Sequence, residues 1–134
     1  MNIKQLRRYI DSRIRIALKS RRHKDDGASD CLATIKSFKN TLAGYGFKDG
    51  SLVFSALKDL FVAVSRLVGR GADNDTLGEV KFCYLKLKQA VAKILNPDIR
   101  KAADEHIRII RFYLKPYYSI KNPSVTQYVA WSDI

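Results

Sequence analysis

The sequence predicts an all-α protein, a compact bundle of about five helices. Five stretches place apolar residues every three or four positions, which is the period of an amphipathic helix. Short segments rich in Gly, Pro, Asn or Asp separate them, and no apolar–polar alternation is long enough to predict a sheet. Such short connections favour antiparallel neighbours, and 134 residues suit a single bundle.

Residues 1–24 form the first predicted helix and the most basic part of the chain. They hold nine Lys or Arg against one Asp, and so contribute most of the formal net charge of +12. Its apolar seam is Ile3, Leu6, Ile10, Ile14 and Ala17. A row of cations lies within roughly 60° on the other side of the helix: Lys4, Arg8, Arg15, Lys19 and Arg22. One face of this helix is therefore suited to the bundle and the other to a polyanion.

The second predicted helix is capped by Ser29 or Asp30 and ends at Gly44. Its inward positions are Leu32, Ile35, Phe38 and Leu42. The Gly-rich loop at 44–50 lacks the pattern of a phosphate-binding loop. We expect Tyr45 and Phe47 in this loop to cover the end of the core.

The third predicted helix follows a Ser51 cap, ends at 69–71 and is the most apolar of the five. Its seam is Val53, Leu57, Leu60, Phe61, Val64, Leu67 and Val68. Apolar residues on its other faces predict that it is central and surrounded. Thr76 and Glu79 then form a capping-box pattern at the start of a fourth helix, which runs to about Leu95. Its inward positions are Leu77, Val80, Tyr84, Leu87, Val91 and Ile94, and Lys81, Lys86, Lys88 and Lys93 lie outside that seam.

A fifth helix begins at Asn96-Pro97, a cap followed by proline, and runs to about Lys115. Its seam is Ile99, Ala103, His106, Ile110 and Tyr113. A second cationic stripe, interrupted by Asp104, spans roughly 100° of this helix: Arg100, Lys101, Arg108, Arg111 and Lys115.

We divide the chain into a basic helical bundle at 1–115 and an aromatic C-terminal arm or short helix at 116–134. The arm contains Tyr117, Tyr118, Tyr128 and Trp131. These rings either cover the end of the bundle or dock onto another subunit or onto bases. We favour docking, because Pro116 and Pro123 break the helical pattern.

The composition predicts a cytoplasmic protein without a membrane span. Cys31 and Cys83 lie in apolar helical patterns, which favours buried, reduced thiols. No apolar run reaches the roughly 20 residues that a membrane helix needs. The Arg-rich start also fits a mitochondrial transit peptide, an alternative to a structural first helix. His23, His106 and the two cysteines lack the spacing of a metal site, so we expect neither metal nor cofactor.

The two cationic stripes favour binding to the phosphate backbone of a nucleic acid, with RNA or single-stranded DNA preferred and without sequence reading. The expected contacts are Lys4, Arg8, Arg15, Lys19, Arg22, Arg100, Arg108, Arg111 and Lys115. In size, charge and helical make-up the chain is similar to the small helical subunits of CRISPR effector complexes. This resemblance implies other protein subunits, or further copies of the chain, as partners. The competing interpretation is an interaction adaptor whose basic face meets an acidic protein or a membrane surface.

The segment Arg100-Lys-Ala-Ala-Asp-Glu-His106 resembles the Arg-x(4–6)-His motif of the HEPN family, small all-α domains that include metal-independent RNases. The resemblance implies catalytic roles for Arg100 and His106. Lys101 departs from the polar residue, often Asn, that the family prefers there. The two side chains lie some 120° apart on a helix, and His106 falls in the apolar seam. We therefore expect a core histidine and no enzymatic activity.

Overall fold

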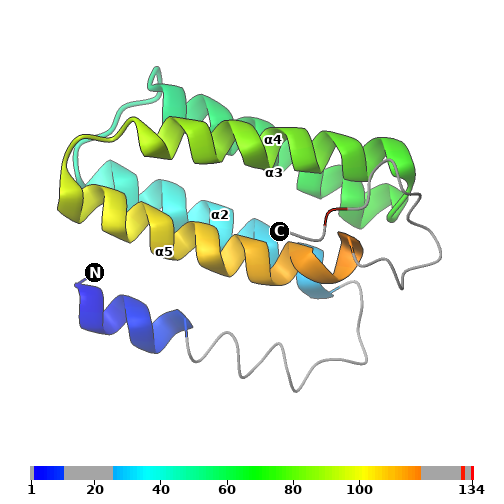
Figure 1. The fold of residues 1–134 in the computed structure, drawn as a ribbon, viewed down its shortest axis with the longest axis horizontal. Coiled ribbons are helices and arrows are strands. Elements are labelled where there is room, and N and C mark those ends of the chain that lie inside the picture. Colours follow the sequence, from blue (N-terminus) through cyan, green and yellow to red (C-terminus); the bar gives the residue numbers. More distant parts are fainter. Residues whose placement is uncertain (1, 11–25, 119–130, 132–133) are drawn as a thin grey trace.

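A computed structural model describes residues 2–10, 26–118, 131 and 134. Residues 3–10 are helical. Four long helices follow: α2 (Asp26–Gly44), α3 (Leu52–Arg70), α4 (Asn74–Ala92) and α5 (Pro97–Leu114) (Figure 1). A short 3₁₀ helix, η1 (Lys115–Tyr118), continues α5. These residues contain no strand, so the predicted all-α bundle of about five helices is confirmed.

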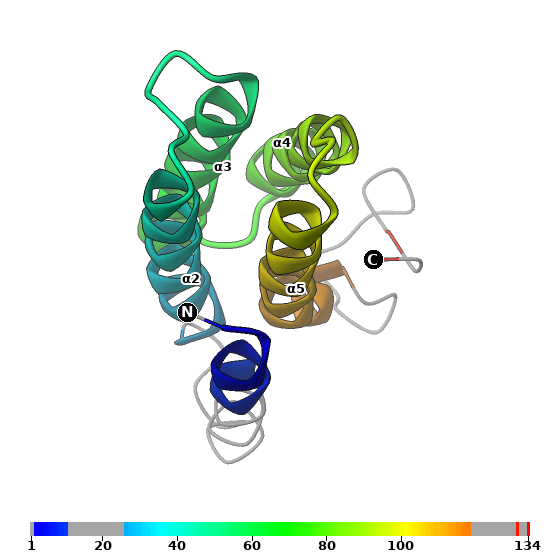
Figure 2. The same cartoon turned by 90° about the vertical axis from the view of Figure 1, so that its left-hand side faces the viewer.

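The four long helices run up and down, each antiparallel to the next (Figure 1). Helix α2 packs against both α3 and α5, and α3 packs against α4. Figure 2 shows the four helices at the corners of the bundle, with the N-terminal helix against the α2 and α5 side. Helix α3 is therefore a corner of the bundle, and the prediction that it is central and surrounded is wrong. Val62, on another face of this helix, is 42% exposed, and Val68, predicted for the seam, is 47% exposed.

Two of the predicted helix starts are confirmed by hydrogen bonds to the cap residues. The Ser51 hydroxyl oxygen accepts a hydrogen bond from the backbone N–H of Phe54 at 3.3 Å. The Asn96 side-chain oxygen accepts from the N–H groups of Asp98 and Ile99 at 2.9 and 3.2 Å, with proline at the first helical position. Gly44 ends α2 as predicted.

The other two starts lie earlier than predicted. Helix α2 begins at Asp26, so Ser29 and Asp30 lie inside it. Helix α4 is capped by Asp73, whose carboxylate accepts from the N–H of Thr76 at 2.7 Å. This hydrogen bond lowers the pKa of the Asp73 carboxyl. Because Asp73 is the cap residue, Thr76 lies inside α4, where it is buried, and the predicted capping box does not form.

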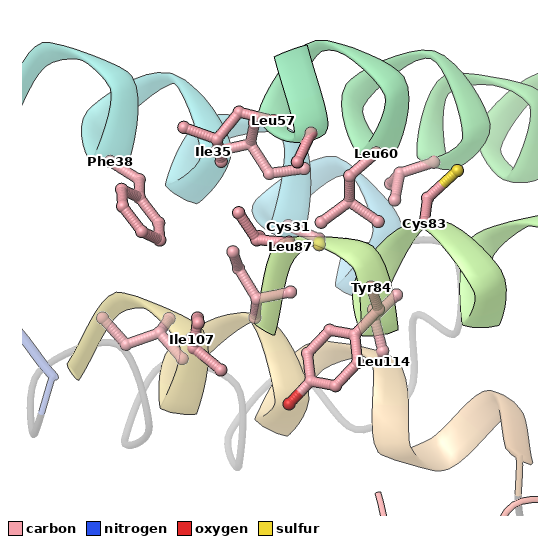
Figure 3. Packing of buried hydrophobic residues seen from close by; sticks show 14 of the residues in the cluster. Cys31, Ile35, Phe38, Leu57, Leu60, Cys83, Tyr84, Leu87, Ile107 and Leu114 are labelled. Carbon is pink, nitrogen blue, oxygen red and sulfur yellow. The ribbon is translucent and has the colours of Figure 1, made fainter. Parts of the chain in front are cut away.

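The core draws on all four long helices (Figure 3). Most of the predicted inward residues that the structure describes are buried, while Leu32, Phe61 and Ile99 are half-buried and Ile3 and Val68 are exposed. Ile14 and Ala17 lie outside the described residues. Both cysteines are buried and free, as predicted, and burial raises the pKa of the Cys31 thiol. Phe47 packs against Phe54, with ring centroids 6.4 Å apart.

Two end residues differ from their predicted positions. Tyr45 is 45% exposed and does not cover the core. Helix α4 ends at Ala92 rather than near Leu95, whose side chain is 94% exposed beyond it.

The aromatic residues after α5 that the structure describes pack on the bundle. Tyr118 is fully buried, and Trp131 packs edge-on against Tyr84 and Tyr118, with ring centroids 5.1 and 5.5 Å apart. The Tyr117 hydroxyl oxygen accepts a hydrogen bond of 3.2 Å from the N–H of Ala28. The preference for docking these three rings onto a partner is therefore wrong, because their described contacts are with α2, with α4 and with one another. Tyr128 lies outside the described residues.

Candidate nucleic-acid interface

The outward face of α5 carries a row of cations that Asp104 interrupts. Helix α5 buries one side against the bundle, through residues that include Ala103, Ile110 and Leu114. The opposite side presents five exposed cations and one exposed acid: Arg100, Lys101, Arg108, Arg111, Lys115 and Asp104. The row extends about 22 Å along the helix, at 1.5 Å per residue. The predicted second stripe is thus one exposed surface in the fold.

The N-terminal helix presents its predicted cations away from the bundle. Leu6 and Ile10 are 4% and 5% exposed, and they attach this helix to the core. Lys4 and Arg8 are exposed, on the side of the helix opposite these two residues. Of the other cations predicted for this face, Arg15, Lys19 and Arg22 lie outside the described residues.

A cavity of about 170 Å³ lies between the N-terminal helix and α5. Its apolar lining comes from Ile10, Ile109 and the half-buried ring of Phe112. Its cationic lining comes from Arg108, Arg111 and Lys115, three residues within two turns of α5. The cavity therefore combines an apolar surface with three charges of one sign.

The charge at this cavity is only partly compensated. The guanidinium of Arg108 lies 3.2 Å from the carboxylate of Glu105, one turn earlier. Among the residues that the structure describes, no acidic side chain forms an ion pair with Arg111 or Lys115. The Arg108 side chain of this pair is 60% exposed, so the Arg108–Glu105 ion pair leaves the guanidinium accessible to an anion. Within the described part of the chain, an anion at this cavity would meet two cations without acidic partners.

Arg100 and His106 do not form a common site. Arg100 is exposed at the start of α5, whereas the His106 side chain is fully buried. The imidazole Nδ1 lies 2.9 Å from the carbonyl oxygen of Ala102, and the ring packs on Phe38 with centroids 4.9 Å apart. Burial lowers the pKa of His106. The prediction of a core histidine is confirmed.

Sequence reasoning does not select Ile10 or Phe112 as site residues. Ile10 is predicted for the apolar seam, and it does occupy that seam. Phe112 lies between a cation and a seam residue in the sequence, so neither pattern includes it. On a helical wheel it falls about 40° from Arg108, between the cationic stripe and the buried side. This border position is the one feature of the sequence that could have indicated Phe112 as a site residue. It does so only once the N-terminal helix is known to pack beside it.

Comparison with protein-family models, curated proteins and solved structures finds no match to this chain. In the described part of the chain, no three His, Cys, Asp or Glu side chains cluster as a metal site would require. Within the same residues, no helix is both long enough and apolar enough to cross a membrane.

Proposed function

We propose that this protein binds single-stranded nucleic acid, RNA or DNA, through phosphate contacts at the outward face of α5 and the adjoining N-terminal helix. The observation that carries the proposal is the cavity whose lining combines Arg108, Arg111 and Lys115 with the half-buried ring of Phe112. A cluster of cations with little acidic compensation favours a phosphate backbone. An accessible ring beside them favours strands whose bases are free to stack.

The arrangement gives each part of the site a distinct role. Arg108, Arg111 and Lys115 bind phosphates, and Arg100 with Lys101 extends the contact toward the start of α5. Phe112 supplies an apolar surface for one base. Lys4 and Arg8 provide further positive charge on the neighbouring helix. None of these contacts distinguishes one base from another, so binding is expected to be independent of sequence. We expect the protein to act within a larger nucleoprotein assembly.

A titration of one length of single-stranded RNA, single-stranded DNA and duplex DNA, each over a series of salt concentrations, tests this function. We expect affinity to fall steeply with salt for all three, and the single strands to bind more tightly than the duplex at each salt concentration. Heparin should displace them. Salt-insensitive binding, or equal affinity for duplex and single strands, would contradict the proposal.

A further inference from the structure

The outward face of α4 carries a stripe of uncharged residues. They recur at alternating spacings of four and three: Gly78, Phe82, Leu85, Gln89 and Ala92. Phe82 and Leu85 are 64% and 41% exposed. This spacing is that of the a and d positions of a heptad, the seam along which two helices pack in a coiled coil. The outward face of α4 thus has the spacing of a helix-packing seam, with Phe82 and Leu85 as its two large apolar residues.

The stripe is not needed for the bundle itself. The opposite side of α4 is already buried, through Leu77, Val80, Tyr84, Leu87 and Val91. Figure 2 shows α4 at a corner of the bundle far from the N-terminal helix. Its outward face is therefore remote from the candidate nucleic-acid interface. A phenylalanine ring about two-thirds exposed beside a leucine is the kind of surface that soluble proteins use for contacts.

Lysines flank the stripe on both sides. The heptad positions next to the seam are Lys81 and Lys88 on one side, and Glu79, Lys86 and Lys93 on the other. Glu79 is ion-paired with Arg66 of α3, and Lys86 lies 3.4 Å from Asp59 of α3. The Lys81 ammonium lies 5.5 Å from the centre of the Trp131 ring, an uncharged neighbour that does not cancel its charge. One border of the seam is therefore positive at Lys81 and Lys88, and the other is positive at Lys93, because Glu79 and Lys86 are both ion-paired with residues of α3.

We propose that the outward face of α4 binds an amphipathic helix of a partner protein, with apolar residues along its seam and Asp or Glu on both flanks. The positions beside the seam decide which helix can pair. A partner with acidic flanks would place its carboxylates opposite Lys81, Lys88 and Lys93. Gln89, a polar residue within the seam, would favour one register.

A second copy of this chain fits the face poorly. A parallel pair of α4 helices would place Lys81 opposite Lys86, and Lys88 opposite Lys93. An antiparallel pair would bring the flank of Lys81 and Lys88 against its own copy, again with lysine facing lysine, although Glu79 would face Lys93 on the other flank. Like charges at these positions oppose pairing. The proposal does not depend on nucleic-acid binding, because it rests on a different helix face.

The test uses the full chain and a synthetic, fluorescent peptide of about three heptads, with Leu at both seam positions and Glu at both flanking positions. We expect the peptide to bind, and the double variant Phe82→Ser with Leu85→Ser to weaken binding at least about tenfold. Val62→Ser is the matched control, because Val62 is an apolar residue of α3 with similar exposure outside the stripe. It should leave the affinity unchanged.

Three further results separate helix docking from simple charge attraction. A peptide of the same composition in scrambled order should bind at least about tenfold more weakly, because it has no seam. The variant with Lys81, Lys88 and Lys93 changed to Glu should prefer a peptide with Lys in place of Glu. The variant with Arg108, Arg111 and Lys115 changed to Gln should bind the acidic peptide like wild type. The proposal would be overturned if the acidic peptide did not bind, or if the scrambled peptide bound equally well. It would also be overturned if the protein self-associated and the Phe82 and Leu85 changes abolished that self-association.

Discussion

The hydroxyl of Tyr118 donates a hydrogen bond of 2.6 Å to the carbonyl oxygen of Leu77, and both residues are fully buried. This hydrogen bond connects η1, directly after α5, to the N-terminal part of α4. The Trp131 ring packs against Tyr118 on the same side of the bundle. Tyr118 is therefore part of the folded core, and the Trp131 ring packs against it.

Two substitutions at Tyr118 should separate the contribution of its hydrogen bond to stability from that of its ring packing. Tyr118→Phe removes only the hydroxyl and should cost about 0.5–1.5 kcal/mol in the free energy of unfolding. Tyr118→Ala also removes the buried ring and should cost about 3–5 kcal/mol. Urea denaturation followed by circular dichroism measures both. A Tyr118→Ala protein as stable as wild type would contradict the packing described here.

Stability should decline at alkaline pH. Burial raises the pKa of Cys31 above its ordinary 9.0 and that of Tyr118 above its ordinary 10.0. Because the unfolded chain loses these protons first, the stabilisation is complete below about pH 9 and falls as pH rises through 9 and 10. Thermal unfolding over this range measures the decline. In Tyr118→Phe the loss of stability above pH 10 should be smaller than in wild type. An unchanged dependence of stability on pH would contradict the attribution of that loss to the Tyr118 hydroxyl.

Trp131 should report a folded environment in the isolated protein. Its ring contacts Tyr84 and Tyr118, so its emission should be blue-shifted relative to the unfolded chain in urea. Trp131→Ala should cost about 1–3 kcal/mol, because it removes two edge-to-face ring contacts and apolar burial. Addition of nucleic acid should leave the emission maximum in place. Solvent-like emission from the free protein would instead support docking onto a partner.

His106 should make the protein less stable in acid. Burial lowers the pKa of His106 below its ordinary 6.5. The unfolded chain therefore binds a proton that the folded chain does not, and stability is complete above about pH 6.5 and falls as pH drops below it. His106→Leu removes the ionisable group, so its stability should depend less on pH between about 4 and 6.5. Urea denaturation at several pH values measures the slope.

The same residue provides a test of RNase activity. The buried imidazole is not accessible to RNA in this fold, so wild-type protein should not cut RNA in the presence of a chelator. His106→Ala should lose about 1–3 kcal/mol of stability and change nothing in that assay. Metal-independent cleavage that disappears in His106→Ala would contradict the assignment of a core histidine and favour the HEPN-like alternative.

Periodicity predicts the fold better than local cap patterns do. The inward positions of α4, from Leu77 to Ile94, are all predicted correctly, because a 3–4 apolar repeat dictates which side a helix buries. The starts of α2 and α4 are not, because several Ser, Thr, Asp and Asn residues lie close together around each start and any of them can cap a helix.

The candidate site is predictable only in part. The cations of α5 form one stripe by spacing alone, and the structure adds only that they are exposed. The cavity beside Phe112 requires the N-terminal helix to pack against α5 through Ile10, an approach of residues far apart in sequence. The predicted environment of Trp131 is wrong, because its partner Tyr84 is also distant along the chain.

The most direct test of nucleic-acid binding is a salt-series titration of single-stranded RNA with two triple variants that remove the same charge. One changes Arg108, Arg111 and Lys115 to Gln. The other, a matched control, changes the exposed residues Lys48, Lys58 and Arg70 to Gln, away from the cavity. Circular dichroism confirms that both are folded.

We expect the first variant to bind at least about tenfold more weakly. Its salt slope should be smaller by about 0.7 for each phosphate of the single strand that the protein no longer neutralises. The control should retain the wild-type slope. Equal reductions in the two variants would mean that only total charge matters, and an unchanged slope in the first would remove α5 from the binding surface.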